Sequence, residues 1–264
     1  MTDPTAAAPA APQILSVELS DLGYALRHGW RDFRSAPLYG LFFASVYVAG
    51  GWLLVWSMTA KGQVWWTLPA SAGFPILGPF IACGLYEVSR RLEIGEPLDW
   101  AGVLKVIFHQ KDRQIPSIAA VIVVFFLFWN FLAHTIFALF LGTSTMTNVS
   151  SSLAIFTTSQ GITMLAVGTF IGAVFSTVLF SLTVVALPML LDRDVDFVTA
   201  MLTSFDLVRT SPVVMLGWGA FIAVLLFLGM ALWFVGLFVV LPVLGHATWH
   251  AYRAIVEGSG GEAK

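Results

Sequence analysis

The stretch PSIAAVIVVFFLFWNFLAHTIFALFL, residues 116–141, contains no Asp, Glu, Lys or Arg. A helix needs about 20 mainly apolar residues to cross the hydrocarbon core of a bilayer, and this stretch is long enough. The surrounding sequence extends the pattern, because no charged residue occurs between Arg113 and Asp192. The segment therefore predicts two membrane-spanning helices in succession.

The rest of the chain has the composition of a polytopic membrane protein. Of its 264 residues, 58% are hydrophobic and 11% are charged, with a mean hydropathy of +0.86, whereas soluble domains carry about 25% charged residues. Three more charge-free intervals, 35–60, 62–86 and 210–252, have room for about four further spans. The sequence predicts an all-α protein with six transmembrane helices, near residues 37–59, 65–86, 116–141, 162–190, 212–232 and 234–253.

The charges also indicate orientation and partners. Twelve of the thirteen Lys and Arg residues fall on one side of the predicted spans, and only Lys61 falls on the other. By the positive-inside rule both termini should be cytoplasmic, with the loop 142–161 on the opposite side. A net charge of −2 predicts no nucleic-acid partner. The expected partners are the lipid bilayer and other membrane-protein subunits, or a second copy of the chain.

A repeated motif divides the chain into three units. Arg34, Arg113 and Arg209 each stand three residues before a proline, at the end of an amphipathic stretch and the start of a span. Proline suits the first turn of a helix, and arginine there can reach lipid headgroups, as Arg253 can at the end of the last span. We predict three repeats of amphipathic helix plus helical hairpin, near 14–90, 97–193 and 195–256, between disordered tails at 1–13 and 257–264.

The amphipathic stretches have two interpretations. The stretch before the first span has an apolar stripe at helical spacing, which consists of Leu15, Leu19, Leu22, Leu26, Trp30 and Phe33. The stripe suits a helix resting in the headgroup layer, or a helix packed on the cytoplasmic face of the bundle.

The second, fourth and sixth spans carry Pro79, Pro188 and Pro242, which should kink or break them. The bend between the last two spans should lie within 229–236.

The stretch PVLGHATWHAYR, residues 242–253, contains the first candidate site. His246 and His250 share one helix face, and the repeat places Cys83 and Glu87 at similar depth in the second span. If these spans are neighbours, the four side chains could bind a metal ion, and no other cofactor is expected. The alternative is that the histidines form the polar rim of the helix end, which the small number of ligands favours.

A second candidate is a polar path through the membrane, which would use His134, Asn130 and Glu87. His134 and Asn130 lie four residues apart on one face of the third span, where polar side chains usually face the bundle interior. Interhelical hydrogen bonds would explain them equally well. Glu87 stands just before Arg90 and Arg91 and should pair with them.

Two stretches, HGWRDFRSAPLYGLFFASVYVAGGWLL (28–54) and LPVLGHATWHAYR (241–253), resemble a family of bacterial integral membrane proteins designated domain of unknown function 2189. The resemblance extends over about residues 20–256. It implies a location in the bacterial inner membrane and transfers no catalytic residues.

The chain contains no phosphate-binding loop, nucleophile elbow, HExxH or CxxC motif. We therefore expect a non-enzymatic scaffold, assembly factor or accessory subunit of a larger membrane complex. One alternative is a small transporter or channel with a path lined by proline-broken second, fourth and sixth helices. The other is a metal-binding or redox membrane protein that uses the candidate metal ligands.

Overall fold

The computed structural model describes residues 16–61, 67–110, 113–142 and 156–258, and this part of the chain is helical and has no strands. The predicted tail 1–13, most of the predicted tail 257–264 and most of the loop 142–161 lie outside the described residues, and residues 257–258 belong to the last helix rather than to a disordered tail. The helices are α1 (Leu19–Ser35), α2 (Pro37–Lys61), α3 (Thr67–Ile94), α4 (Trp100–Gln110), α5 (Ile115–Leu141), α6 (Ser159–Thr183), α7 (Ala186–Asp192), α8 (Phe197–Thr210), α9 (Pro212–Ala231) and α10 (Leu237–Gly258).

Four helical segments in the described part are long and apolar enough to cross a membrane. They are Pro37–Ser57, Ile115–Leu141, Ser159–Asp192 and Pro212–Ala231. The other two predicted spans fall on α3 and α10, which are long helices but are not among these four. Both helices become polar toward their C-terminal ends, so less of their length is apolar.

Prolines begin the helices where the sequence predicts. α2 starts at Pro37 and α9 at Pro212, and Pro116 is the second residue of α5. Proline has no N–H to leave unsatisfied in the first turn, and its φ angle already suits the helix.

The prolines of the predicted even-numbered spans differ in their effect. Pro188 cannot donate to the Val184 carbonyl four residues earlier, and the helix is interrupted between α6 and α7 at residues 184–185. The Val185 N–H donates to Ser204 Oγ of α8 at 3.3 Å. Pro79 and Pro242 lie inside α3 and α10, which continue past them. Of the three spans predicted to be kinked or broken at proline, the fourth is interrupted, whereas α3 and α10 are continuous, because one missing hydrogen bond does not unfold a helix held on several sides.

The bend between α9 and α10 occupies residues 232–236, as predicted. Trp233 and Phe234 have positive φ angles of 54° and 63°, and a Cβ on Gly236 would lie only 2.7 Å from the Gly229 Cα. The Trp52 indole donates to the Trp233 carbonyl at 2.8 Å and so ties this turn to α2. A side chain at position 236 would separate the two arms of the turn.

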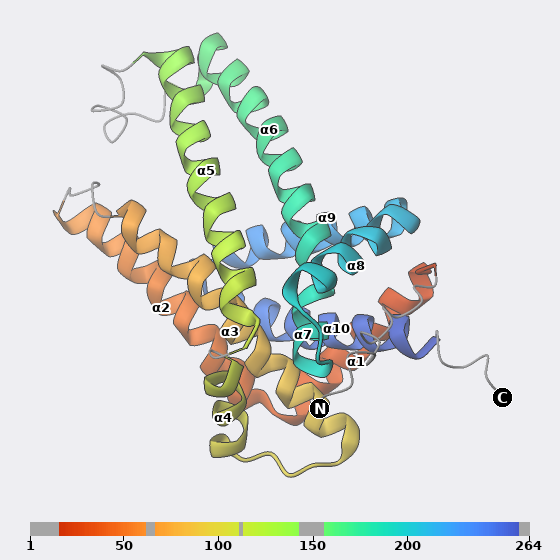
Figure 1. Ribbon diagram of the computed structural model, residues 1–264. Helices are drawn as coiled ribbons and strands as arrows, with labels where there is room; N and C mark the ends of the chain where they lie inside the picture. Colours follow the sequence, from red (N-terminus) through yellow and green to blue (C-terminus); the bar gives the residue numbers. More distant parts are fainter. Residues whose placement is uncertain (1–15, 62–66, 111–112, 143–155, 259–264) are drawn as a thin grey trace, which may run out of the picture.

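The three short amphipathic helices pack in a common pattern. α4 packs on α3, and α8 packs on α6 and α7, so each contacts the end of the preceding hairpin. α1, the first of the described helices, packs instead on α10, the last of them. In Figure 1 the two run side by side, while α5 and α6 project as a long hairpin. The order of elements fits three units of short helix plus hairpin; their descent from one repeat stays a prediction.

The packed face of α1 overlaps the predicted apolar stripe only in part. Leu22 of that stripe is buried, whereas Leu19 and Trp30 are exposed. The buried residues of α1 are Leu22, Ala25, Gly29 and Asp32. A Cβ on Gly29 would lie 2.6 Å from the Ala247 backbone nitrogen, so small residues allow the two backbones to touch. Close backbone contact, rather than the most apolar face, decides how α1 lies.

Candidate functional site

A buried polar cluster lies where α1, α3 and α10 meet, and consists of Asp32, Ser89, His246 and His250. His250 Nε2 lies 2.6 Å from Asp32 Oδ2, and both side chains are at most 5% exposed. Burial acts to raise the pKa of Asp32, but the hydrogen bond and the charge interaction with His250 outweigh it and hold that pKa below its ordinary value. The contact therefore favours a carboxylate that accepts a hydrogen bond from the imidazole.

The second pair of the cluster joins α3 to α10. Ser89 Oγ lies 2.8 Å from His246 Nδ1, and both residues are fully buried. Within the described structure, the other ring nitrogen, His246 Nε2, has no hydrogen-bond partner. The two pairs connect the first helix of the described chain with the last and with α3.

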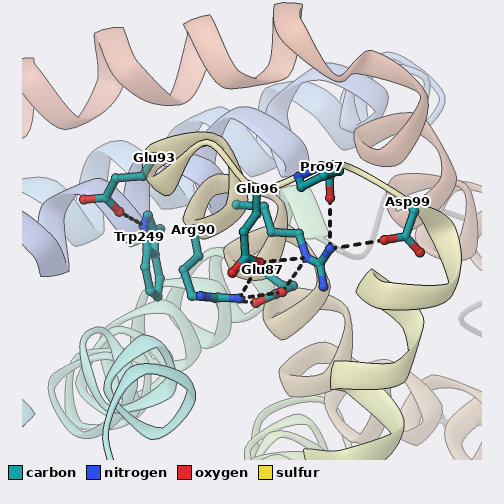
Figure 2. A network of polar contacts seen from close by, with 8 residues as sticks. Glu87, Arg90, Glu93, Glu96, Pro97, Asp99 and Trp249 are labelled. Atoms are coloured by element: carbon teal, nitrogen blue, oxygen red, sulfur yellow. Dashed lines mark hydrogen bonds and ion pairs between the residues drawn. The ribbon is translucent and has the colours of Figure 1, made fainter.

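Glu87 belongs to a separate ion-pair network, shown in Figure 2. Its carboxylate accepts bonds of 2.7 and 3.0 Å from Arg90 and of 2.7 Å from Arg91. Arg91 also donates to the Pro97 carbonyl at 2.9 Å and to Asp99 at 3.2 Å. The predicted pairing of Glu87 with both arginines is present, and it fixes the connection between α3 and α4.

The aromatic end of α10 is also tied to its neighbours. The Trp249 indole donates to Glu93 at 2.9 Å (Figure 2), and the Tyr252 hydroxyl donates to Asp192 at 2.7 Å. Arg253 pairs with Glu93 at 3.0 Å. This predicted lipid anchor is thus held within the protein.

The other predicted lipid anchors differ in whether they are paired within the protein or exposed. Arg113 pairs with Asp194, whereas Arg34 and Arg209 are exposed at the ends of α1 and α8. The role of these last two arginines as lipid anchors stays a prediction.

The structure does not gather the four predicted metal ligands. His250 contacts Asp32, His246 contacts Ser89, and Glu87 contacts two arginines. Cys83 lies in the apolar core. Over the described ranges, no group of three or more His, Cys, Asp or Glu side chains is arranged to hold a metal ion. A metal site would require α3 and α10 to bring these four side chains together. Instead, α1 supplies the partner of His250, and the arginines of α3 supply the partners of Glu87.

The predicted polar path is likewise not assembled. His134 Nδ1 lies 2.7 Å from the Asn130 carbonyl, and Asn130 Nδ2 donates to the Phe126 carbonyl at 2.9 Å. Both side chains thus bond to their own helix, and His134 is exposed. Glu87 is engaged in its network with Arg90 and Arg91.

An apolar cavity of about 910 Å³ lies between α5, α6 and α9. The described residues that line it include no charged or histidine side chain, so it is separate from the polar cluster. It was not among the sites that the sequence predicts. The small residues of its wall, among them Gly168, Gly172 and Gly219, were the available signal, but such residues are common in membrane helices.

Comparison with known proteins identifies one segment of the chain. Residues 67–192 match the family described as predicted integral membrane protein (DUF2189). The predicted family is confirmed, over a shorter range than expected, and this range does not include the two stretches, 28–54 and 241–253, on which the resemblance was based. No curated protein and no solved structure matches the chain.

The DUF2189 segment coincides with structural boundaries. It starts at the first residue of α3 and ends at the last residue of α7. It contains Ser89 and the Glu87 network, whereas Asp32, His246 and His250 lie outside it. The buried polar cluster therefore joins the DUF2189 segment to the helices on either side of it.

Proposed function

We propose that this integral membrane protein is non-enzymatic, resides in the inner membrane of a bacterium, and scaffolds, assembles or accompanies a larger membrane complex. One observation carries the proposal: the four side chains of the buried polar cluster are engaged in two pairs between helices. Asp32 with His250 and Ser89 with His246 hold α1, α3 and α10 together. Groups engaged in this way stabilise the fold and are not presented to a substrate.

The surface of the apolar helices supports the same role. In each of α5, the α6–α7 segment and α9, only 17% of the most apolar window is buried inside the protein. The remaining surface of these helices is available to lipid or to the helices of other subunits. Small residues such as Gly217 of α9, which is exposed, allow close approach of a second helix.

We further propose that α3 and α10 complete six crossings, with both termini cytoplasmic. α3 returns along α2, as shown by the Tyr47 hydroxyl, which donates to the Phe74 carbonyl at 3.3 Å. Near the start of α2, Phe43 packs against Gly84 near the end of α3. Two helices paired in this way over their length cross the same layer.

Gentle extraction from native membranes followed by native mass spectrometry tests the accessory role. We expect one or more other membrane subunits in fixed stoichiometry with this chain. Recovery of the chain alone, from membranes whose other complexes survive the same extraction, would contradict the proposal. Metal analysis of the same sample tests the metal-binding alternative, which requires bound metal that His250→Ala removes.

Transport is the second candidate, and the break between α6 and α7 favours it, because interrupted helices often form solute sites. In proteoliposomes, this function predicts substrate-dependent flux that Glu87→Gln reduces. The described core beside the break is filled by large side chains, including Met189, Trp249 and Tyr252, which is why we place the accessory role first.

A further inference from the structure

The cavity between α5, α6 and α9 has the size of a ligand site. Its volume of about 910 Å³ is within the range of about 300–1,000 Å³ that is usual for small-molecule and cofactor sites. Three helices line most of it, and Pro75 of α3 closes one edge.

The lining selects an apolar ligand. Aromatic rings dominate the wall, including Phe125, Trp129, Phe175 and Phe180. The polar side chains that line it are the hydroxyls of Thr169, Ser176 and Thr177. Without a charged group or an imidazole to recognise an ion or a polar head, the wall suits a hydrocarbon.

The flexibility of the occupant favours a lipid chain over a helix of another protein. A helix is a rigid cylinder about 10 Å wide, whereas an acyl chain can follow the shape of the wall. The helices that form the wall are three of the four candidate spans, so membrane lipid reaches the cavity by lateral movement.

We propose that this cavity binds the acyl chain of a membrane phospholipid. The hydrophobic effect does not drive this binding, because the bilayer is as apolar as the wall. The chain is retained by van der Waals contact with wall atoms that would otherwise lack neighbours on one side. This site is independent of the proposed accessory role, since a lipid can occupy it whether or not a partner subunit is present.

Two glycines provide a matched pair of variants. A Cβ on Gly168, in the cavity wall, would meet no atom within 4 Å, so Gly168→Leu fills cavity space without a clash. A Cβ on Gly217 also meets no atom within 4 Å, and Gly217 lies on α9 outside the wall. Both changes replace a glycine inside a helix by a better helix former, so we expect both variants to fold.

The experiment uses the full chain in vesicles containing phosphatidylethanolamine with a photoreactive diazirine in its acyl chain. After illumination, mass spectrometry maps the labelled peptides. We expect labels concentrated on α5, α6 and α9 around the cavity, falling by about tenfold in Gly168→Leu, which corresponds to about 1.4 kcal/mol of binding. Labelling of Gly217→Leu should equal that of the unmodified protein.

Equal labelling of the cavity peptides in Gly168→Leu and Gly217→Leu would overturn the proposal, as would labels spread evenly along all lipid-facing helices. Native mass spectrometry of the unmodified protein supplies a second measurement. An adduct with the mass of an isoprenoid quinone that Gly168→Leu abolishes would assign the cavity to that class and reject the phospholipid. Loss of partner subunits in Gly217→Leu, with the cavity peptides labelled as in the unmodified protein, would concern only the accessory role.

Discussion

At the scale of single residues, the contact between Asp32 and His250 is both long-range and buried. It joins side chains 218 positions apart at 2.6 Å, and both are buried. Removing one member of such a pair leaves the other buried without a partner, which costs more than the pair contributes.

We predict that His250→Ala lowers the free energy of unfolding by about 3 kcal/mol, because Asp32 then loses its principal partner. Denaturant unfolding in mixed micelles, followed by tryptophan fluorescence, measures this loss. His134→Ala is the control, because His134 is exposed and bonds only to its own helix among the contacts of the described chain. If the two variants unfold alike, the buried pair has no special role in stability.

The same pair predicts a dependence on pH. The pKa of Asp32 is lower in the folded protein than its ordinary value, so between the two values the unfolded chain binds more protons and stability increases with pH. The stabilisation that ionised Asp32 provides is complete above about pH 4, the ordinary pKa range for aspartate. It is lost as the pH falls through the pKa of Asp32 in the folded protein. Unfolding measured between pH 3 and about 6 should therefore show a steeper acid loss for the unmodified protein than for Asp32→Asn. Parallel profiles would refute this.

At the scale of elements, the contact of α1 with α10 depends on the absence of a side chain at Gly29. Gly29 faces the Ala247 nitrogen and the Val243 carbonyl, and an added Cβ would lie 2.6 and 2.7 Å from them. Backbone atoms of a packed helix cannot move aside as the tip of a side chain can. α1 must therefore shift as a whole if a methyl group is introduced.

Two alanine substitutions in α1 should consequently have opposite effects. Gly29→Ala should destabilise the protein by about 1–3 kcal/mol through overpacking, although alanine is the better helix former. Gly23→Ala, at a position with no atom within 4 Å of the new Cβ, should stabilise it by about 0.5–1 kcal/mol. Limited proteolysis of α1 in detergent and thermal unfolding measure both changes. A stabilising Gly29→Ala would show that α1 is not held against α10.

At the scale of the whole molecule, the orientation in the membrane can be tested because Cys83 is buried and should not react with external thiol reagents. Ser20 of α1 and Ser159 of α6 are exposed and lie on opposite sides in the predicted topology. Ser20→Cys should react with a membrane-impermeant maleimide only in inside-out vesicles, and Ser159→Cys only in intact spheroplasts. Labelling of both from the same side would rule out the six-span arrangement.

The sequence by itself determined features that depend on neighbouring residues or on bulk composition. Long apolar stretches without charge identify membrane helices such as Ile115–Leu141, and prolines mark where α2 and α9 start. The pairing of Glu87 with Arg90 and Arg91 also follows from helical spacing, because residues three and four apart share a face.

Tertiary structure decided which distant residues meet. Nothing in the local pattern indicates that His250 pairs with Asp32 rather than with Glu87, or that His246 pairs with Ser89. The packed face of α1 was decided in the same way, since Gly29 matters only once Ala247 is beside it. The cavity likewise exists because three helices diverge, and the space between helices is a property of their arrangement. Local sequence fixes what each helix is, whereas long-range packing selects its neighbours.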